Sequence, residues 1–342
     1  MRMASSSPDS IRRLGGFARW AVGAIGSGLP AVFGSRLSIL IFHRVHAETD
    51  ALFPREPDAD RFRELMQFLR SCFHFVSLDD AVQALREGRL RPGTVVVSFD
   101  DGYRDNLEVA CPILSELGIP AAFFVATGFM AGGLMWNDRL IESIRGAPGG
   151  ERELSRELAR ILAEPKLATG QPVSRRDLCL RSLGAVKYLP PAERDQAVGR
   201  IECALGAAPG SLMMDPEQVR RLRDYGMTVG GHTINHPILS GLAEDEARHE
   251  IAGGKRALES VLGETVRYFA YPNGKPGVDY SARDVGLVRE AGFEAAVSTE
   301  WGVAGPCADL HQLPRFTPWD RDPARFGLRL ALDLRRRDYA RA

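Results

Sequence analysis

A short apolar run that ends at two adjacent carboxylates constrains this chain more than any other stretch. Thr94 to Phe99 read Thr-Val-Val-Val-Ser-Phe, and Asp100, Asp101 and Gly102 follow at once. A β-branched run with almost no polar residue is typical of a strand covered on both faces, and such strands belong mainly to parallel α/β sheets. Functional groups in these folds lie where the strands end. Because Asp-Asp-Gly is also ordinary turn chemistry, this stretch alone leaves a turn and a site open.

A second stretch supplies two imidazoles. Gly-Gly-His-Thr-Ile-Asn-His-Pro occupies residues 230–237, directly after the apolar segment Met227 to Val229. His232 and His236 are four residues apart, a spacing that allows both rings to reach one metal ion. Pro237 disfavours a long helix, so a tight turn at a strand end is expected. With a strand-end aspartate, two histidines form a ligand set that leaves a coordination position open on a divalent metal.

Both stretches resemble motifs of the polysaccharide deacetylases, the family of the NodB-homology domain or carbohydrate esterase family 4. Ser-Phe-Asp-Asp-Gly at 98–102 resembles the first motif, and His-Thr-Ile-Asn-His-Pro at 232–237 resembles the second. Weaker similarities follow in the family's order: residues 37–45 to its first strand, 269–274 to its third motif and 313–315 to a late strand. The resemblance therefore extends over most of the chain.

The resemblance implies a reaction and a role for four residues. Asp101, His232 and His236 would hold a divalent metal ion, with Zn²⁺ as the default for this ligand set. Metal-bound water would attack the acetyl carbon while Asp100 accepts the proton as general base. The products would be acetate and, for an N-acetyl substrate, a free amine on the sugar. The same resemblance places Tyr103, Tyr271 and Asn273 at the substrate, with a main-chain N–H near Asn273 as an oxyanion donor.

The sequence departs from the family pattern at two places. The third motif often carries an arginine that orients the catalytic aspartate, but Ala270 stands at that position, so the charge partner of Asp100 is missing or supplied elsewhere. The usual Leu-x-His motif of the general acid is also absent. His311 is one candidate for the acid; Arg315 and His43, which each end a predicted strand, are the other polar candidates.

The order of the segments predicts an α/β fold, a distorted (β/α) barrel of seven or eight strands. Short apolar runs alternate with amphipathic helical patterns from residue 37 onward. Between about 130 and 214 the strand pattern stops, and charged, Leu/Ala-rich segments such as 151–163 and 192–205 predict a helical insertion. We therefore expect a NodB-like barrel over 36–330 that carries this insertion. The predicted flanking segments are an N-terminal leader over 1–35 and a basic tail over 331–342.

Composition excludes some functions and leaves the compartment open. The 44 basic and 44 acidic residues give a formal net charge of zero, which argues against a nucleic-acid binder that relies on bulk positive charge. The five cysteines are widely spaced and form no Cys-x-x-Cys pair, so neither a disulfide framework nor a thiolate zinc site is expected. Most should be buried small apolar residues, which favours a reducing compartment.

The first 35 residues contain a broken apolar stretch. Arg12 and Arg13 precede a Gly- and Ala-rich segment, 14–33, that Arg19 and Pro30 interrupt, so a membrane span is not expected. We expect a leader without an insertion function, with a secretory signal and a membrane-surface anchor as alternatives. The resulting expectation is a cytoplasmic or membrane-peripheral protein, with a periplasmic or secreted one as the alternative.

The expected function is deacetylation of an acetylated oligo- or polysaccharide, either a bacterial glycan, as in exopolysaccharide biosynthesis, or a lipid-linked precursor. Two alternatives remain at this point: a hydrolase of other C–N bonds from the same superfamily, and a non-catalytic glycan-binding relative. Ala270 would permit the non-catalytic relative. The intact set of two aspartates and two histidines argues against it, because binding alone needs neither a metal nor a base.

Overall fold

One parallel sheet forms the centre of the protein. The computed structural model describes residues 35–168, 173–206, 210–317, 320–334 and 339–342. The strand order is β1-β3-β4-β5-β6-β7-β8, with β2 beside β3, and neighbouring strands pair in parallel. The strands are β1 (Leu37–Phe42), β2 (His74–Phe75), β3 (Thr94–Phe99), β4 (Ala121–Val125), β5 (Thr228–Gly231), β6 (Tyr268–Ala270), β7 (Ala295–Trp301) and β8 (Leu313–Arg315).

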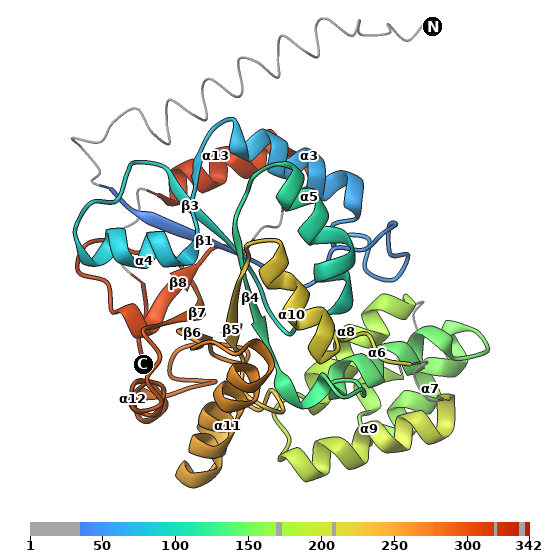
Figure 1. Ribbon diagram of the computed structural model, residues 1–342. Helices are drawn as coiled ribbons and strands as arrows, with labels where there is room; N and C mark the ends of the chain where they lie inside the picture. The colour runs from blue at the N-terminus through green and yellow to red at the C-terminus, as the bar shows by residue number, and fades with distance from the viewer. Residues whose placement is uncertain (1–34, 169–172, 207–209, 318–319, 335–338) are drawn as a thin grey trace, which may run out of the picture.

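The sheet curls until its two ends meet (Figure 1). Just past β8, the N–H of Phe316 donates to the carbonyl oxygen of Ile39 at 2.7 Å, and the N–H of Ile41 donates to that of Phe316 at 3.1 Å. These bonds bring β8 beside β1, so seven strands form a nearly closed barrel. The predicted barrel is confirmed, and the carboxyl ends of its strands converge on one edge.

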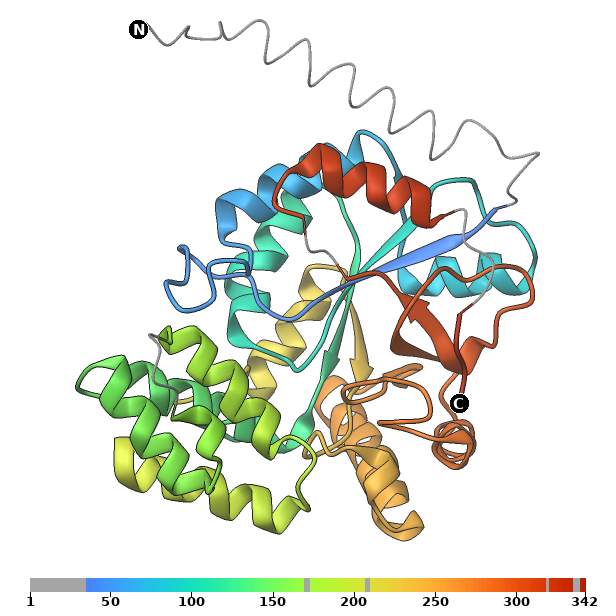
Figure 2. The same cartoon turned by 180° about the vertical axis from the view of Figure 1, so that it is seen from behind.

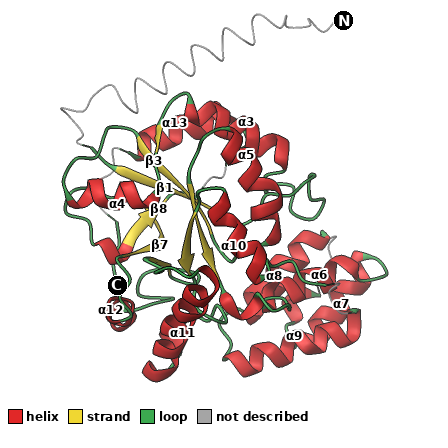
Figure 3. Ribbon diagram, in the orientation of Figure 1, coloured by secondary structure: helices red, strands yellow, loops and turns green. Residues whose placement is uncertain are grey.

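Helices cover the outside of the barrel (Figure 3). They start and stop where local signals predict: Asp215 caps α10 with a reciprocal bond from Gln218, and Gly263 ends α11 at φ 70°. The covering helices are α3 (Ala59–Arg70), α4 (Leu78–Arg86), α5 (Cys111–Glu116), α10 (Pro216–Asp224), α11 (Glu244–Leu262), α12 (Ala282–Glu290) and α13 (Pro323–Asp333). Short 3₁₀ turns are η2 (Thr127–Phe129), η3 (Pro165–Leu167), η4 (Leu239–Gly241) and η5 (Leu310–Gln312).

One predicted helix differs in detail. The sequence predicts a single helix from about Asp105 to Leu117, whereas the structure has a π-helical turn, η1 (Asn106–Ala110), before α5. Pro112 lies in the first turn of α5 and has no N–H to donate to the preceding turn. The wider π turn ends just before this proline, which is consistent with the missing donor.

The segment between β4 and α10 is a four-helix unit beside the barrel (Figures 1 and 2). Its helices are α6 (Trp136–Gly146), α7 (Glu151–Leu162), α8 (Arg175–Val186) and α9 (Pro191–Leu205). They share a hydrophobic cluster of their own, which includes Leu140, Leu158, Leu178 and Ile201. Leu52, from the loop after β1, also belongs to this cluster. The insertion is therefore joined to the loop that follows the first strand.

Other predictions concern the ends of the chain and the cysteines. The leader, apart from residue 35, lies outside the described residues. Within the described part, no helix combines the length and the apolar character that crossing a membrane requires. Helix α13 extends to Asp333 and so includes the start of the predicted tail. The cysteines are free thiols, and Cys72, Cys111 and Cys179 are buried, as predicted for most of the five.

Candidate active site

The two aspartates lie in a tight turn where β3 ends. Asp101 has a φ of 77° and Gly102 a φ of 88°, both in the left-handed region. A Cβ on Gly102 would lie 2.9 Å from Cγ1 of Val125, so the neighbouring strand β4 also requires glycine here. The turn reading of Asp-Asp-Gly is therefore confirmed, and this turn is compatible with a site. The turn presents Asp100 and Asp101 at the carboxyl edge of the barrel, next to the end of β5.

Asp101, His232 and His236 form a cluster with the dimensions of a metal site. Oδ1 of Asp101 lies 3.4 Å from Nε2 of His232 and 3.4 Å from Nε2 of His236. Ligand atoms around a tetrahedral Zn²⁺, about 2.0–2.1 Å from the ion, would lie roughly 3.3–3.4 Å apart. Oδ1 is buried and accepts no hydrogen bond from the described part of the chain, a costly arrangement unless a cation is bound there. The three residues therefore fit a divalent metal.

The histidine turn is held from two sides. Nδ1 of His232 lies 2.7 Å from the carbonyl oxygen of Ala270; because that oxygen can only accept, Nδ1 carries the proton and Nε2 keeps its lone pair for a metal. Glu250 of α11 accepts hydrogen bonds from the main-chain N–H groups of Ile234 and Asn235, at 2.9 and 2.8 Å. These contacts fix both the tautomer of the first ligand and the shape of the turn that carries the second.

The electrostatics of the cluster favour the metal-binding forms of Asp101 and His236. Burial would lower the pKa of His232, but Asp101 and Asp100 outweigh it and raise that pKa. Burial would raise the pKa of Asp101, but His236, His232 and His43 outweigh it and hold that pKa well below its usual range. Burial lowers the pKa of His236 to about 4, which leaves its imidazole neutral near pH 7. An ionised carboxylate and a neutral imidazole are the forms that bind a metal.

Asp100 is paired with Arg315 from the far strand β8. Nη1 and Nη2 of Arg315 donate to Oδ1 and Oδ2 of Asp100 at 2.7 and 2.6 Å, and Nε donates to the carbonyl oxygen of Ser298 at 2.7 Å. Burial would raise the pKa of Asp100, but Arg315, His232 and His43 lower it. The charge partner that Ala270 does not provide is thus supplied by Arg315. The guanidinium of Arg315 is buried and engaged in these hydrogen bonds, and arginine does not give up its proton in proteins. Arg315 therefore positions the base and is a poor proton donor.

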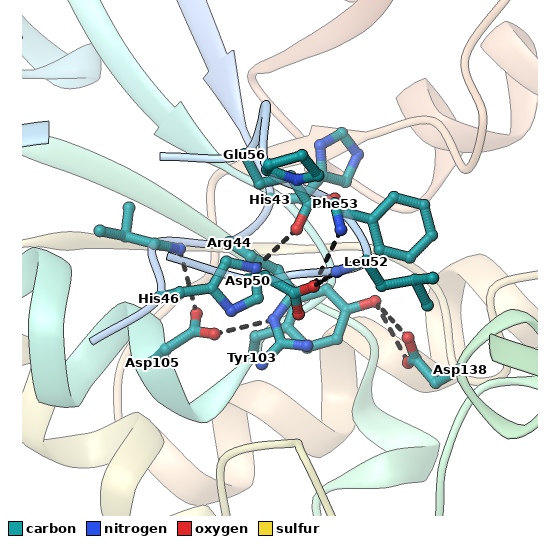
Figure 4. Close-up of polar contacts among 12 residues, drawn as sticks. His43, Arg44, His46, Asp50, Leu52, Phe53, Glu56, Tyr103, Asp105 and Asp138 are labelled. Carbon is teal, nitrogen blue, oxygen red and sulfur yellow. Dashed lines mark hydrogen bonds and ion pairs between the residues drawn. The ribbon is translucent and has the colours of Figure 1, made fainter. Parts of the chain in front are cut away.

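A cleft of about 490 Å³ opens from the metal cluster toward the insertion. Tyr103 and Asp138 form its inner wall: the Tyr103 hydroxyl donates to the carboxylate of Asp138 at 3.0 Å (Figure 4). The guanidinium of Arg44 lies 4.9 Å from the centre of the Tyr103 ring and donates to Asp105 at 2.8 Å. Tyr103 thus lines the cleft, and its contact with the substrate stays a prediction. Asp138 belongs to α6, so the insertion contributes directly to the cleft.

Of three further predicted site residues, His43 lines the cleft, whereas His311 and Tyr271 do not. His43 follows β1, is exposed, and lines the cleft together with Asp101. His311 lies in η5, before β8 begins, and its Nε2 is 2.9 Å from the carbonyl oxygen of Phe293, so the structure does not bring it to the cluster. Tyr271 is fully buried and stacks on Tyr280, with 3.9 Å between the ring centroids. It is not part of the cleft wall, which corrects its predicted placement at the substrate.

Asn273 lies in the turn after β6, at the same edge of the barrel as the cluster. Its φ of 58° and the hydrogen bond from Oγ1 of Thr299 to its carbonyl oxygen, at 2.6 Å, fix this turn. Its role as an oxyanion donor stays a prediction. Trp136 starts α6, packs against the cluster of the insertion and lies under Arg194, whereas Asn137 and Asp138 line the cleft.

With this geometry in view, comparison with known proteins decides the family. The model of the family described as "Polysaccharide deacetylase" matches residues 87–164 and 188–296, more than half of the chain. The chain belongs to the polysaccharide deacetylase family. It is therefore a hydrolase of the class that acts on non-peptide carbon–nitrogen bonds, and its Asp101–His232–His236 cluster agrees with the divalent metal dependence of this family.

Individual relatives are distant. The putative polysaccharide deacetylase YxkH of Bacillus subtilis (strain 168) is 25% identical over 284 residues, which cover 82% of this chain and 71% of that protein. Deacetylase PplD of Streptococcus pyogenes, solved in complex with acetate, superposes with a TM-score of 0.56 at 18% identity, covering 87% of this chain and 98% of that one. IcaB of Ammonifex degensii superposes with a TM-score of 0.54 at 20% identity, covering 89% and 98%. At such identities the structural likeness supports the barrel fold alone.

Sequence reasoning missed Glu250. For Trp136, Asn137 and Asp138, it weighed a place in the substrate cleft against the start of a helix anchored by the tryptophan, and it favoured the helix start. Glu250 lies among several other acidic residues of α11, so no local pattern distinguishes it. A partial signal existed for Asp138, because it follows Trp136 and Asn137 at the start of a helix that enters from the end of β4.

Proposed function

We propose that this protein is a zinc-dependent deacetylase that removes N-acetyl groups from a bacterial glycan or glycan precursor. Two neighbouring carboxylates carry the proposal. Oδ1 of Asp101 lies between two imidazoles and accepts no hydrogen bond in the described part of the chain, and Arg315 keeps the adjacent Asp100 ionised. A metal at Asp101, His232 and His236 would supply a Lewis acid for the acetyl carbonyl and would lower the pKa of water.

Asp100 serves as the general base. The amide hydrolysis forms a bond from the water oxygen to the acetyl carbon, and Asp100 accepts the proton that this water gives up. The bidentate contact with Arg315 fixes the orientation of the carboxylate and disfavours its protonation before the reaction. Asp100 and Asp101 are adjacent at a strand end and point in different directions, so one can act as base while the other holds the metal.

His43 serves as the general acid. The departing nitrogen must gain a proton when the C–N bond breaks, and a donor on the cleft side of the cluster is needed. His43 lines the cleft next to Asp101, is exposed to solvent that can return its proton, and influences the pKa of both aspartates. The products are acetate and a sugar amine.

The test compares acetate release with metal content. The zinc-loaded full chain should release acetate from N-acetylated oligosaccharides, a chelated sample should not, and added Zn²⁺ should restore the rate. Co²⁺ and Ni²⁺ should be added in parallel, because the same ligands accept them. Asp100→Asn should keep the metal and lose activity, whereas His232→Ala should lose both. Metal bound without acetate release from any substrate would favour the non-catalytic reading.

A further inference from the structure

The cleft has an outer part that the proposed chemistry at the metal cluster does not use. Three segments build it: the loop around Phe53, helices α6 and α8 of the insertion, and Arg321 before α13. Helix α6 points outward along the cleft, since Asp138 stands near the cluster and Arg145 lies about 10 Å further along the helix at 1.5 Å per residue. The outer part is thus a product of the insertion and of the loop joined to it through Leu52.

Three arginines line this outer part, and none has a carboxylate closer than 4.0 Å among the residues that the structure describes. Arg55 is exposed and makes no ion pair in the described part of the chain. The guanidinium of Arg321 donates to a main-chain carbonyl, that of Pro54. The one ion pair of Arg176 with a described residue is with its neighbour Asp177, at 4.0 Å. Guanidinium groups that line one cleft and have donors beyond these contacts favour an anion with several oxygens, such as a phosphate.

The acidic residues around these arginines are already engaged. Each carboxylate of the outer cleft lies within 3.1 Å of a basic side chain other than the three arginines. The pairs are His46–Glu56 at 2.7 Å, Arg145–Glu142 at 3.1 Å and Arg329–Asp320 at 2.7 Å. Within the described residues, the closest basic partner of each of these carboxylates is therefore a side chain other than Arg55, Arg176 or Arg321.

An apolar wall lies beside the arginines. Phe53, Ile141, Leu180 and Leu183 line the same cleft. Arg176, Leu180 and Leu183 follow the spacing i, i+4, i+7 and so share one face of α8. Leu180 is 43% exposed, which places a large apolar side chain at the edge of a functional cleft.

We propose that the outer cleft binds the phosphate and the first apolar segment of a lipid-linked sugar. The acetylated sugar lies at the metal cluster, the phosphate that joins it to the lipid meets Arg55, Arg176 and Arg321, and the lipid chain lies against the α8 leucines. This inference rests on the proposed function and names its substrate class. A neutral polysaccharide offers the guanidinium groups hydroxyl acceptors but no negative charge. It would also place hydroxyl groups against the leucines, where these hydroxyl groups lose their solvation without new hydrogen bonds.

Binding can be tested without turnover. The zinc-loaded full chain is titrated calorimetrically with decyl phosphate below its aggregation concentration, and with inorganic phosphate and decyl maltoside as comparison probes. We expect decyl phosphate to bind best, and Arg176→Ala and Leu180→Ser each to weaken it about tenfold. Two matched controls should bind like the wild type: Arg181→Ala, an exposed arginine of α8 outside the cleft, and Leu328→Ser, a leucine of α13 that is 42% exposed.

Equal weakening in the control variants, or equal binding of decyl maltoside, would overturn the proposal. If inorganic phosphate binds as tightly as decyl phosphate, the lipid part of the proposal is rejected. Acetate release then separates this inference from the proposed function. The substrates are N-acetylglucosamine joined to decanol through a phosphate, the matched decyl glycoside without phosphate, and a neutral N-acetylated oligosaccharide.

Preferred turnover of the phosphate-linked sugar, lost in Arg176→Ala, would support both proposals. Preferred turnover of the neutral oligosaccharide would uphold the deacetylase and reject the lipid-phosphate site. Decyl phosphate binding that follows the variants, with no acetate released from any substrate, would uphold the site and reject the deacetylase.

Discussion

Arg315 reaches from β8 to the end of β3 and holds Asp100 with both of its Nη atoms, at 2.7 and 2.6 Å. Both side chains are almost fully buried, with exposed fractions of 0% and 3%. The two residues are 215 positions apart in the chain. A single ion pair thus connects the last strand of the barrel with the base and helps to fix the relative position of β3 and β8.

Replacing Arg315 should therefore affect stability and activity together. Arg315→Ala leaves a buried, unpaired carboxylate and should lower the free energy of unfolding by about 3–5 kcal/mol. Acetate release should be lost as well. Arg315→Lys keeps the charge but cannot form the two-pronged contact, so it should be intermediate in both respects. Urea unfolding and acetate assays measure the two effects.

The double variant Arg315→Met with Asp100→Asn serves as the control. It removes both charges, so its free energy of unfolding should recover most of the loss while activity stays absent. A double variant no more stable than Arg315→Ala would show that packing of the arginine, and not its charge, stabilises the barrel.

His43 and His311 offer a matched pair of histidine substitutions. His43→Gln should lower kcat by about 10²–10⁴-fold, since the departing amine loses its proton donor, while metal content and stability stay near the wild-type values. His311→Gln should leave kcat unchanged, because the ring of His311 contacts the carbonyl of Phe293 away from the cluster. Steady-state kinetics with metal analysis decides the assignment, and a larger loss of kcat in His311→Gln would reverse it.

Glu250 should control metal affinity although it is no ligand. Its carboxylate accepts three hydrogen bonds from the histidine turn, two from main-chain N–H groups and one from the Asn235 amide at 2.7 Å. Glu250→Gln should weaken Zn²⁺ binding about 10–100-fold, the usual effect of losing a residue that orients ligands. Competition with a fluorescent chelator measures this affinity. Glu246→Gln, an exposed change on the same helix, should leave it unchanged.

Asp50, in the loop after β1, should make the free energy of unfolding depend on pH. It accepts hydrogen bonds from the N–H groups of Leu52 and Phe53 and from Arg145, which lower its pKa from 3.8 to about 2 against the opposing effect of burial. Because the folded-state pKa is the lower one, this stabilisation is present above the ordinary pKa and disappears as the pH falls through about 2. Asp50→Asn should therefore cost roughly 1 kcal/mol or less at neutral pH, since solvent screens the pair.

The pH dependence is measured as the difference in free energy of unfolding between wild type and Asp50→Asn. This difference should be constant above about pH 5 and should shrink between about pH 4 and 2. A difference that does not change with pH would mean that Asp50 contributes through packing alone.

The sequence by itself determined the strands that carry the site and the turn residues at their ends. The apolar run before Asp100, the glycine after Asp101 and the spacing of His232 and His236 are local patterns, and backbone sterics translate such patterns directly into structure. The helix boundaries at Asp215 and Gly263 were predictable for the same reason, because capping acts over a few residues.

The tertiary structure alone decided which distant residues complete the site. Arg315 takes the place of the family arginine that is absent at position 270, where Ala270 stands. Glu250 accepts hydrogen bonds from the histidine turn, and Tyr271 stacks on Tyr280 instead of lining the cleft. The first depends on the closure of β8 on β1 and the second on the packing of α11 against the barrel, whereas Tyr271 and Tyr280 meet through the path of the loop between β6 and α12. The separations run from 9 positions for Tyr271 and Tyr280 to 215 for Asp100 and Arg315, beyond the reach of helix or strand spacing, so no local pattern in one sequence specifies which of several arginines, glutamates or tyrosines will meet.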